Sequence, residues 1–194
     1  MYQELISTLN QLAPIEPEEE KIFISIFKPK TYKHGEYFIQ PGSINRYLGF
    51  ITKGLVRYYI YRKGTETTIK FGAEGEFVAE YRSFMEGDKS AIFIQMLEDT
   101  QMLVADNIGI QTTYKEVKNG NAIGRLVAEQ RFTSLSQQLL SLYQHSPEER
   151  YTYFMQTFPE LIQRVPQYYI ASFVGVKPES LSRIKKRILS ERIS

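Results

Sequence analysis

The chain has 194 residues with an apolar fraction of 42% and a charged fraction of 24%, values typical of a folded globular protein. It contains no cysteine, which excludes disulfides, thiolate-ligated zinc, cysteine-ligated iron–sulfur clusters and cysteine nucleophiles. The net charge is only +2, the N-terminus lacks the features of a secretory signal, and no apolar run approaches the roughly 20 residues of a membrane-spanning helix. We therefore expect a cytoplasmic protein with no membrane partner.

Residues 1–30 are predicted to form two helices. The first carries one apolar stripe at helical spacing, formed by Leu5, Ile6, Leu9 and Leu12. The second starts near Pro17 with three glutamates in its first turn, where the helix dipole favours negative charge. Pro29 is expected to end this helix.

From residue 31 to residue 106 the sequence consists of short segments rich in aromatic and β-branched residues, separated by glycine-containing turns. The segments cover residues 37–39, 47–52, 55–61, 67–71, 92–97 and 101–105. Short β-rich runs at roughly ten-residue spacing predict an antiparallel sandwich or barrel.

A long helix is predicted from about Asn121 to Gln144, with apolar residues on more than one face. These residues are Ile123, Leu126, Val127, Phe132, Leu135, Leu139 and Leu142. Such a helix buries surface against more than one neighbour, and we expect one neighbour to be a second copy of the chain. The alternative is a helix packed only on its own domain. The next helix is expected to follow Ser146, with Pro147 at its first position, and to end near Thr157.

Positive charge gathers in the C-terminal segment. From Arg164 onward there are seven basic residues and two acidic ones, 7 − 2 = +5, which leaves 17 − 20 = −3 for the rest of the chain. The basic residues are Arg164, Lys177, Arg183, Lys185, Lys186, Arg187 and Arg192. Positive charge at one end is what a surface that binds a polyanion requires, although charge alone would also fit a merely solvated basic tail.

The same segment has the pattern of a helix-turn-helix. We predict one helix from about Gln167 to Phe173, a tight turn at Gly175 and a second helix from Pro178. Ala171 is small enough to let two helices cross closely, and Gly175 supplies the backbone freedom that a short turn needs.

The second helix is predicted to have two distinct faces. At 100° per residue, Leu181, Ile184 and Ile188 fall within one narrow sector and form a buried stripe. The opposite side carries Glu179, Arg183, Lys186 and Ser190. An arginine and a glutamate on one exposed face suit a helix in the major groove, since arginine can grip guanine and glutamate can accept from cytosine. We therefore predict binding to double-stranded DNA.

Several local segments fit one known family pattern. In the β-rich part these are Gly35-Glu36, Pro41-Gly42, Tyr47-Leu48-Gly49-Phe50-Ile51, Lys53-Gly54-Leu55-Val56-Arg57 and Gly75-Glu76-Phe77. In the C-terminal part they are Ile170-Ala171-Ser172-Phe173-Val174-Gly175-Val176 and Glu179-Ser180-Leu181-Ser182-Arg183-Ile184. On these motifs the chain resembles the family of the cyclic-AMP receptor protein and FNR regulators, especially short members that end just after the recognition helix.

The resemblance implies an α+β fold in three parts. An N-terminal antiparallel β-roll sensor domain, like the jelly roll of cyclic nucleotide-binding domains and with flanking helices, is expected over residues 1–115. A long dimerisation helix is expected over 116–145, and a C-terminal helix-turn-helix domain that binds DNA over 146–194. The function it implies is that of a sequence-specific transcription regulator that binds a two-fold symmetric operator as a homodimer.

The resemblance also assigns residues to DNA contact. Glu179 and Arg183 take base-reading positions, Ser180 takes a backbone-contacting one, and Pro178 replaces a further base-reading arginine, so the operator is expected to differ. Lys177 occupies a position usually held by a Ser or Thr cap. The full set of predicted DNA-binding residues is Gln167, Lys177, Glu179, Ser180, Arg183, Lys186 and Arg187.

The effector site is less well matched. Members that bind cyclic AMP hold its phosphate with an arginine followed by serine or threonine, downstream of a Gly-Glu whose carboxylate meets the ribose. Here Gly75-Glu76 is present, but the candidate pair is Lys89-Ser90, which lies farther on than expected, and Arg82 has unsuitable neighbours. A lysine is a poor replacement for a bidentate arginine. We therefore expect this pocket to take another small effector or none, rather than cyclic AMP.

Other classes of function are disfavoured. The two histidines, His34 and His145, are isolated and are predicted to be solvated, so neither a metal site nor haem is expected. The sequence has no phosphate loop, nucleophile elbow, paired-histidine site or Cys–His pair, and we do not expect an enzyme. The main alternative is a cyclic-nucleotide-binding regulatory module without DNA binding. The expected partners are double-stranded DNA and a second copy of the chain, with RNA polymerase as a further candidate.

Overall fold

A computed structural model describes residues 1–191, so Arg192 of the basic C-terminal segment lies outside the described residues. The chain divides into two compact units. The first contains Met1–Ile60 and Lys70–Phe132, and the second contains Tyr61–Ile69 and Thr133–Ser194. The division passes through a β-hairpin and through the long helix, so each of these elements contributes residues to both units.

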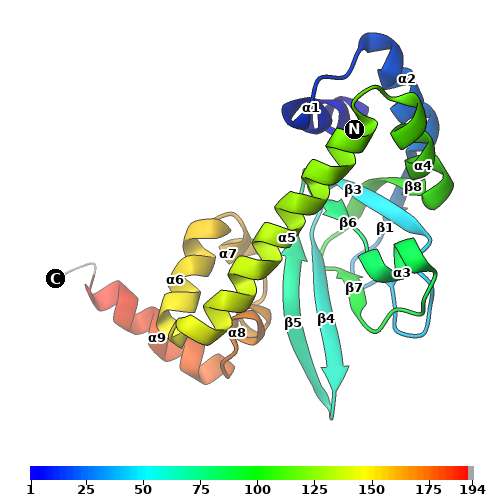
Figure 1. Cartoon of the computed structure of the whole chain (residues 1–194). Coiled ribbons are helices and arrows are strands. Elements are labelled where there is room, and N and C mark those ends of the chain that lie inside the picture. The colour runs from blue at the N-terminus through cyan, green and yellow to red at the C-terminus, as the bar shows by residue number, and fades with distance from the viewer. Residues whose placement is uncertain (192–194) are drawn as a thin grey trace. The chain divides into compact units, whose positions relative to one another are not determined.

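The first unit is built around an antiparallel β-roll, as predicted (Figure 1). In the described part of the chain, the strands form two four-stranded sheets with the orders β1-β8-β3-β6 and β2-β7-β4-β5. The strands are β1 (Lys28–Tyr32), β2 (Tyr37–Ile39), β3 (Tyr47–Lys53), β4 (Val56–Arg62), β5 (Thr65–Gly72), β6 (Phe77–Val78), β7 (Phe93–Met96) and β8 (Thr100–Asp106). The sequence did not predict β1, an exposed edge strand without apolar alternation, or β6, which has two residues.

Strands β3 and β8, at the centre of their sheet, are buried on both faces. In their register, Phe50 lies opposite Leu103 and Ile51 lies opposite Met102. Phe50 and Leu103 belong to the apolar core beneath the helices, so the next pair along the strands faces the interior of the roll. All four side chains are fully buried. Covering on both faces explains why these strands have continuous apolar runs rather than simple alternation.

Three helices cover the outer face of this sheet (Figure 1): α1 (Tyr2–Leu12), α2 (Pro17–Ile26) and α4 (Asn107–Glu116). Of the predicted stripe on α1, Leu5, Ile6 and Leu9 are buried and Leu12 is partly buried. Glu18, Glu19 and Glu20 lie in the first turn of α2, as predicted, and Glu19 also forms a capping box with Glu16, the residue before the helix. Helix α2 ends at Ile26, and the proline expected to stop it lies within β1.

Helix α5 (Gly120–Gln144) is the predicted long helix, and it packs closely on α4 at its start. A Cβ atom added at Gly124 would lie 2.5 Å from the ring of Tyr114, so a larger residue there would force the ring to move. Ile123 is buried in the same core as α1, α2 and α4. The first turns of α5 are therefore anchored in the first unit.

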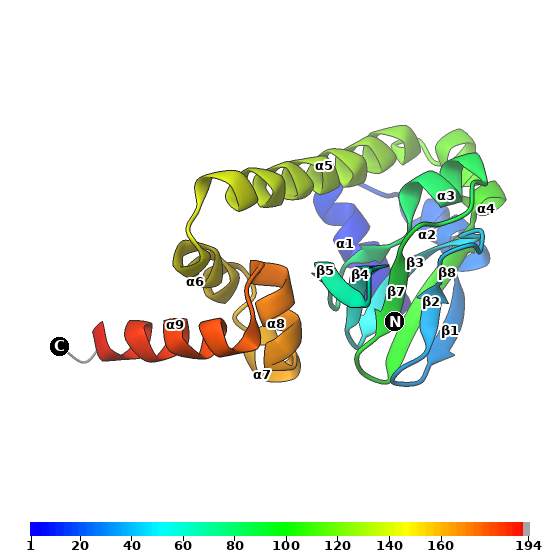
Figure 2. The same cartoon turned by 90° about the horizontal axis from the view of Figure 1, so that it is seen from below.

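The second unit is mainly helical, with α6 (Pro147–Thr157), α7 (Leu161–Arg164), α8 (Gln167–Val174) and α9 (Pro178–Glu191) (Figure 2). Its core contains three aromatic rings, since Phe154 lies 5.6 Å from Phe158 and 5.5 Å from Phe173 between ring centroids. Helix α6 starts at the predicted Ser146 cap, which forms a capping box with Glu149. None of the helices described is long and apolar enough to cross a membrane.

Candidate nucleic-acid interface

Helices α8 and α9 are joined by a tight turn at Gly175, as the sequence predicts. The φ angle of Gly175 is 79°, in the left-handed region that glycine adopts without strain. The chain reverses here because the backbone N–H of Val176 donates to the carbonyl oxygen of Ala171 at 2.9 Å. Ala171 is fully buried, and α8 and α9 pack against each other.

Helix α9 has one apolar and one charged face. Leu181 and Ile184 are buried, and Ile188 is half-buried, which agrees with the predicted stripe. The opposite side is exposed to solvent and carries Glu179, Arg183, Lys186 and Ser190. The exposed side therefore offers a carboxylate acceptor and two long cationic donors along one helix.

Two charged residues of α6, Arg150 and Glu148, form hydrogen bonds with α8 and α9. The Nε atom of Arg150 donates to the carbonyl oxygen of Val174 at 2.6 Å, and its Nη1 atom donates to the carbonyl oxygen of His145 at 2.7 Å. Arg150 thus satisfies carbonyl groups at the ends of both α8 and α5. Glu148 accepts from Arg187 of α9, with its Oε1 atom 3.1 Å from Nε. This ion pair links α9 to α6.

The residues predicted to contact DNA are placed in three ways. Glu179, Lys177 and Lys186 are exposed, and Arg183 is exposed with its Nη2 atom 3.2 Å from the hydroxyl of Ser180. Gln167 lies at the start of α8, where its Oε1 atom accepts a hydrogen bond from Nζ of Lys185 at 2.9 Å. Arg187 is paired with Glu148 of α6.

Lys185 is a basic residue of this surface that the sequence reasoning left out. Its position on α9 lies beside the buried Ile184, and its contact with Gln167 crosses between the two helices. A pattern on one helix carries no signal for such a contact. Only the packing of α8 on α9 brings the two side chains together.

The long helix α5 leaves a set of large apolar side chains exposed in its second half. They are Phe132 (75% exposed), Leu135 (49%), Leu139 (55%), Leu140 (52%), Leu142 (47%) and Tyr143 (82%). Large apolar side chains gathered in this way on a helix are a marker of a protein–protein interface.

The predicted effector residue Glu76 lies in a cluster of charges at the roll. Its Oε2 atom is 2.9 Å from Lys70 Nζ and 2.6 Å from Arg131 Nη1. Arg131, on α5, also donates from Nη2 to the carbonyl oxygen of Phe77 at 2.5 Å. Burial raises the pKa of Glu76, but the charges of Lys70 and Arg131 outweigh it and hold that pKa below its usual value. For Lys70, burial and the neighbouring Arg131 lower the pKa.

Lys89 and Ser90 lie elsewhere, in the connection between α3 (Tyr81–Glu86) and β7. Lys89 is exposed, whereas Ser90 is buried and its hydroxyl lies 3.0 Å from the carbonyl oxygen and 3.1 Å from the nitrogen of Ile92. Within residues 1–191, no hydrogen bond or ion pair joins Lys89 or Ser90 to Glu76. The structure therefore does not bring the predicted effector residues together through direct contacts.

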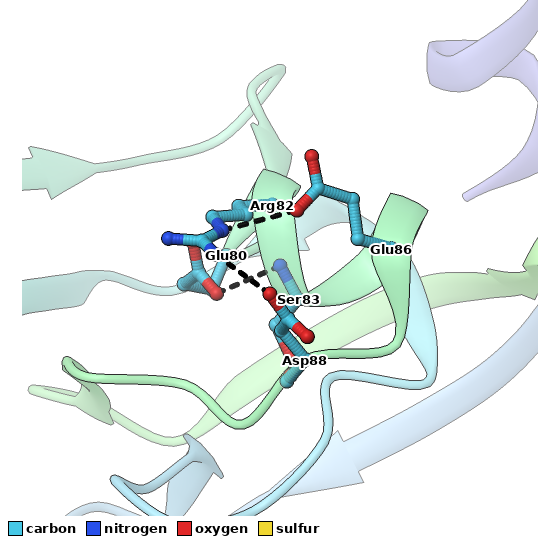
Figure 3. Close-up of polar contacts among 5 residues, drawn as sticks. All are labelled: Glu80, Arg82, Ser83, Glu86 and Asp88. Atoms are coloured by element: carbon cyan, nitrogen blue, oxygen red, sulfur yellow. Dashed lines mark hydrogen bonds and ion pairs between the residues drawn. The ribbon is translucent and has the colours of Figure 1, made fainter.

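Figure 3 shows the polar contacts that hold α3 and this connection. The carboxylate of Glu80 accepts from the backbone N–H of Ser83 at 2.9 Å and so caps α3. Arg82 donates to Glu86 at 3.0 Å and to Asp88 at 2.7 Å. Glu80 is nearer in sequence to Lys89-Ser90 than Glu76 is, and the sequence did not lead us to predict that it caps a helix. An acidic residue directly before a short helix was the available signal.

Residues 29–117 match the family described as the cyclic nucleotide-binding domain. This match covers the β-roll together with α3 and α4, so the N-terminal part of the chain has the fold of a cyclic nucleotide-binding domain. No curated protein matches the sequence.

Solved structures extend the similarity over most of the chain. FixK2 from Bradyrhizobium japonicum superposes with a TM-score of 0.76 at 14% identity, covering 87% of this chain and 87% of that one. The c-di-GMP-responsive global regulator CLP of Xanthomonas campestris has a TM-score of 0.69 at 16% identity, with 91% and 93% covered. The catabolite activator protein of Thermus thermophilus has a TM-score of 0.58 at 19% identity, with 95% and 87% covered. The chain thus shares the fold of these proteins.

Proposed function

We propose that this protein is a sequence-specific transcription regulator of the CRP/FNR type, in which α8 and α9 form a helix-turn-helix that binds double-stranded DNA. The observation that carries the proposal is the charged, exposed face of α9, whose opposite face is apolar and buried, in a helix that packs on α8 and is paired with Glu148 of α6. The shared fold with CLP, which is a global regulator linking cell–cell signalling to virulence gene expression, supports it. Such a role requires no catalytic site.

The residues of this surface, on α8, on α9 and in the turn between them, are assigned two different roles. Arg183 and Glu179 can form directional hydrogen bonds with base edges in the major groove and would select sequence. Gln167, Lys177, Ser180, Lys186 and Arg187 would contact the phosphate backbone, which positions the helix but carries little sequence information. Arg187 would have to leave Glu148 or reach a phosphate from beside it.

We further propose that the regulator is a homodimer that reads a two-fold symmetric operator. The support is the set of apolar side chains that α5 leaves exposed from Phe132 to Tyr143. Burying them against the same face of a second copy would remove that apolar area from water. A two-fold axis between two copies would also present two α9 helices to two half-sites. RNA polymerase is a further partner for a regulator of this kind.

The effector is proposed not to be cyclic AMP. The carboxylate of Glu76 is already engaged by two cations, the hydroxyl of Ser90 is engaged by Ile92, and Lys89 replaces a bidentate arginine. The effector would then be another small molecule, or the protein would act without an effector. No cysteine-ligated cluster and no haem are part of the proposal, since the sequence has no cysteine and two separated histidines.

The test of DNA binding compares two substitutions on α9. Arg183→Ala should cost about 1–3 kcal/mol on the preferred duplex and relax the choice at one base position. Lys186→Ala should weaken binding to specific and random duplexes nearly equally and reduce the salt slope by about one per subunit. The measurement is a salt titration of both variants after selection of preferred sites from random duplex DNA.

Two outcomes would count against this proposal. If Arg183→Ala lost affinity equally on specific and random duplexes, α9 would not read bases. If the unmodified protein showed no retention on duplex DNA at low salt, the chain would instead be a ligand-binding regulatory module.

A further inference from the structure

We propose that the tip of the β4–β5 hairpin is a second DNA-contacting element, which binds phosphates beside the site occupied by α9. The tip, Tyr61–Ile69, belongs to the second unit together with α8 and α9. This inference rests on the proposed DNA binding and adds to it a surface outside the helix-turn-helix.

The hairpin tip is joined to α8 by its backbone. The hydroxyl of Ser172 on α8 accepts from the backbone N–H of Thr68 at 2.9 Å and lies 3.2 Å from the carbonyl oxygen of Glu66, to which it donates. On the other side, the side-chain amide of Gln138 donates to the carbonyl oxygen of Ile69. The tip is therefore attached to the same helix that leads into α9, and it would move with the DNA-binding unit.

The end of the hairpin presents positive charge. Arg62 and Lys63 are exposed, and the neighbouring Tyr61 is 60% exposed. Neither cation forms an ion pair in the part of the chain that the structure describes. With the acidic Glu66, the tip has a net charge of 2 − 1 = +1. Lys63 lies three residues from Glu66 and five from Thr68, the two residues bonded to Ser172, a reach of about 10–17 Å for an extended strand.

The turn of the hairpin has Lys63 at a position whose backbone conformation disfavours lysine. The φ angles are 50° at Lys63 and 82° at Gly64, so both central residues of this two-residue turn are left-handed. Hairpin turns of this type favour Asn, Asp or Gly at both positions, and a side chain such as lysine costs about 1–2 kcal/mol in the left-handed region. A cost to folding at an exposed side chain indicates that the charge has another use. Phosphate binding is the use that suits two cations and an adjacent tyrosine hydroxyl.

The decisive variant combines Arg62→Gln with Lys63→Asn. Asparagine suits the left-handed turn, so this variant should fold at least as stably as the unmodified protein, while it loses two positive charges. We expect its salt slope for DNA binding to fall by up to about two per subunit, on preferred and random duplexes alike. The matched control is Arg46→Gln with Lys115→Gln, which removes one arginine and one lysine exposed on the first unit and should leave the slope unchanged.

A footprint locates the contact. Hydroxyl-radical footprinting should show protected phosphates flanking each half-site, and the double variant should lose this flanking protection while keeping the protection at the half-sites. Ser172→Ala, which removes both bonds to the tip, should weaken the flanking protection in the same way. A double variant with an unchanged slope and footprint would overturn the inference. Failure of the unmodified protein to bind any duplex would instead overturn the proposed function.

Discussion

The charge cluster of Glu76, Lys70 and Arg131 gives a prediction whose size and pH dependence both follow from its geometry. The perturbation is Glu76→Gln, which keeps the shape and one acceptor oxygen but removes the negative charge. Glu76 makes contacts of 2.9 and 2.6 Å with the two cations, whose side chains are 18% and 30% exposed. A hydrogen bond to a charged group contributes about 1.5–3 kcal/mol, and partial exposure together with the retained oxygen brings the expected loss to about 2 kcal/mol at pH 7.

The sign of the pH dependence follows from the lowered pKa of Glu76. Its ordinary value is 4.5, and the native cations hold its pKa below that value. The stabilisation by the carboxylate is therefore complete above about pH 4.5 and is lost as the pH falls through the native pKa. Below that pKa the unmodified protein carries a protonated Glu76, so the difference from Glu76→Gln should vanish.

The assay is urea unfolding at a series of pH values, followed by far-ultraviolet circular dichroism because the chain has no tryptophan. Protein concentration must be held constant, since association would add to the apparent stability. The control is Glu86→Gln, whose carboxylate is 60% exposed and paired with Arg82, and which should change stability by less than about 1 kcal/mol. A loss for Glu76→Gln that is equal at acidic and neutral pH would refute the electrostatic reasoning.

Two further predictions concern the partners. The protein should sediment at twice the mass of the chain at micromolar concentration. The double variant Leu135→Asp with Leu139→Asp on α5 should sediment as a monomer, because it replaces two apolar side chains of the proposed interface by charged ones. A monomer for the unmodified protein, with and without DNA, would contradict the proposed interface. Calorimetry with cyclic AMP should show no binding at low-micromolar concentration; a dissociation constant in that range that is abolished by Lys89→Ala would show that the pocket accepts the nucleotide.

Most elements of the fold could be predicted because their signals are local. The start of α6 at Ser146-Pro147 and the left-handed turn at Gly175 are set by residues within one helical turn. The two faces of α9 follow from helical periodicity alone, as the buried Leu181 and Ile184 show. The β-rich segments were also found, since aromatic and β-branched residues favour strands wherever those strands pair.

Elements with weak local patterns were missed for a physical reason. The strand β1 has exposed side chains and is defined by its pairing with β8, with Lys28 opposite Val104 and Tyr32 opposite Thr100. The short helix α3 is too brief for a periodic pattern, and the cap by Glu80 was not recognised. In both cases the deciding partner lies outside the segment.

The charged contacts were decided by tertiary structure alone. Arg131 reaches Glu76 from α5, Arg187 reaches Glu148, and Ser172 holds the backbone of a hairpin 104 residues away at Thr68. A side chain's position on its own helix is fixed by about 100° of rotation per residue, which the sequence alone provides. Which other surface that side chain meets depends on how the apolar faces of separate elements pack together, and this packing selects partners that no local spacing encodes.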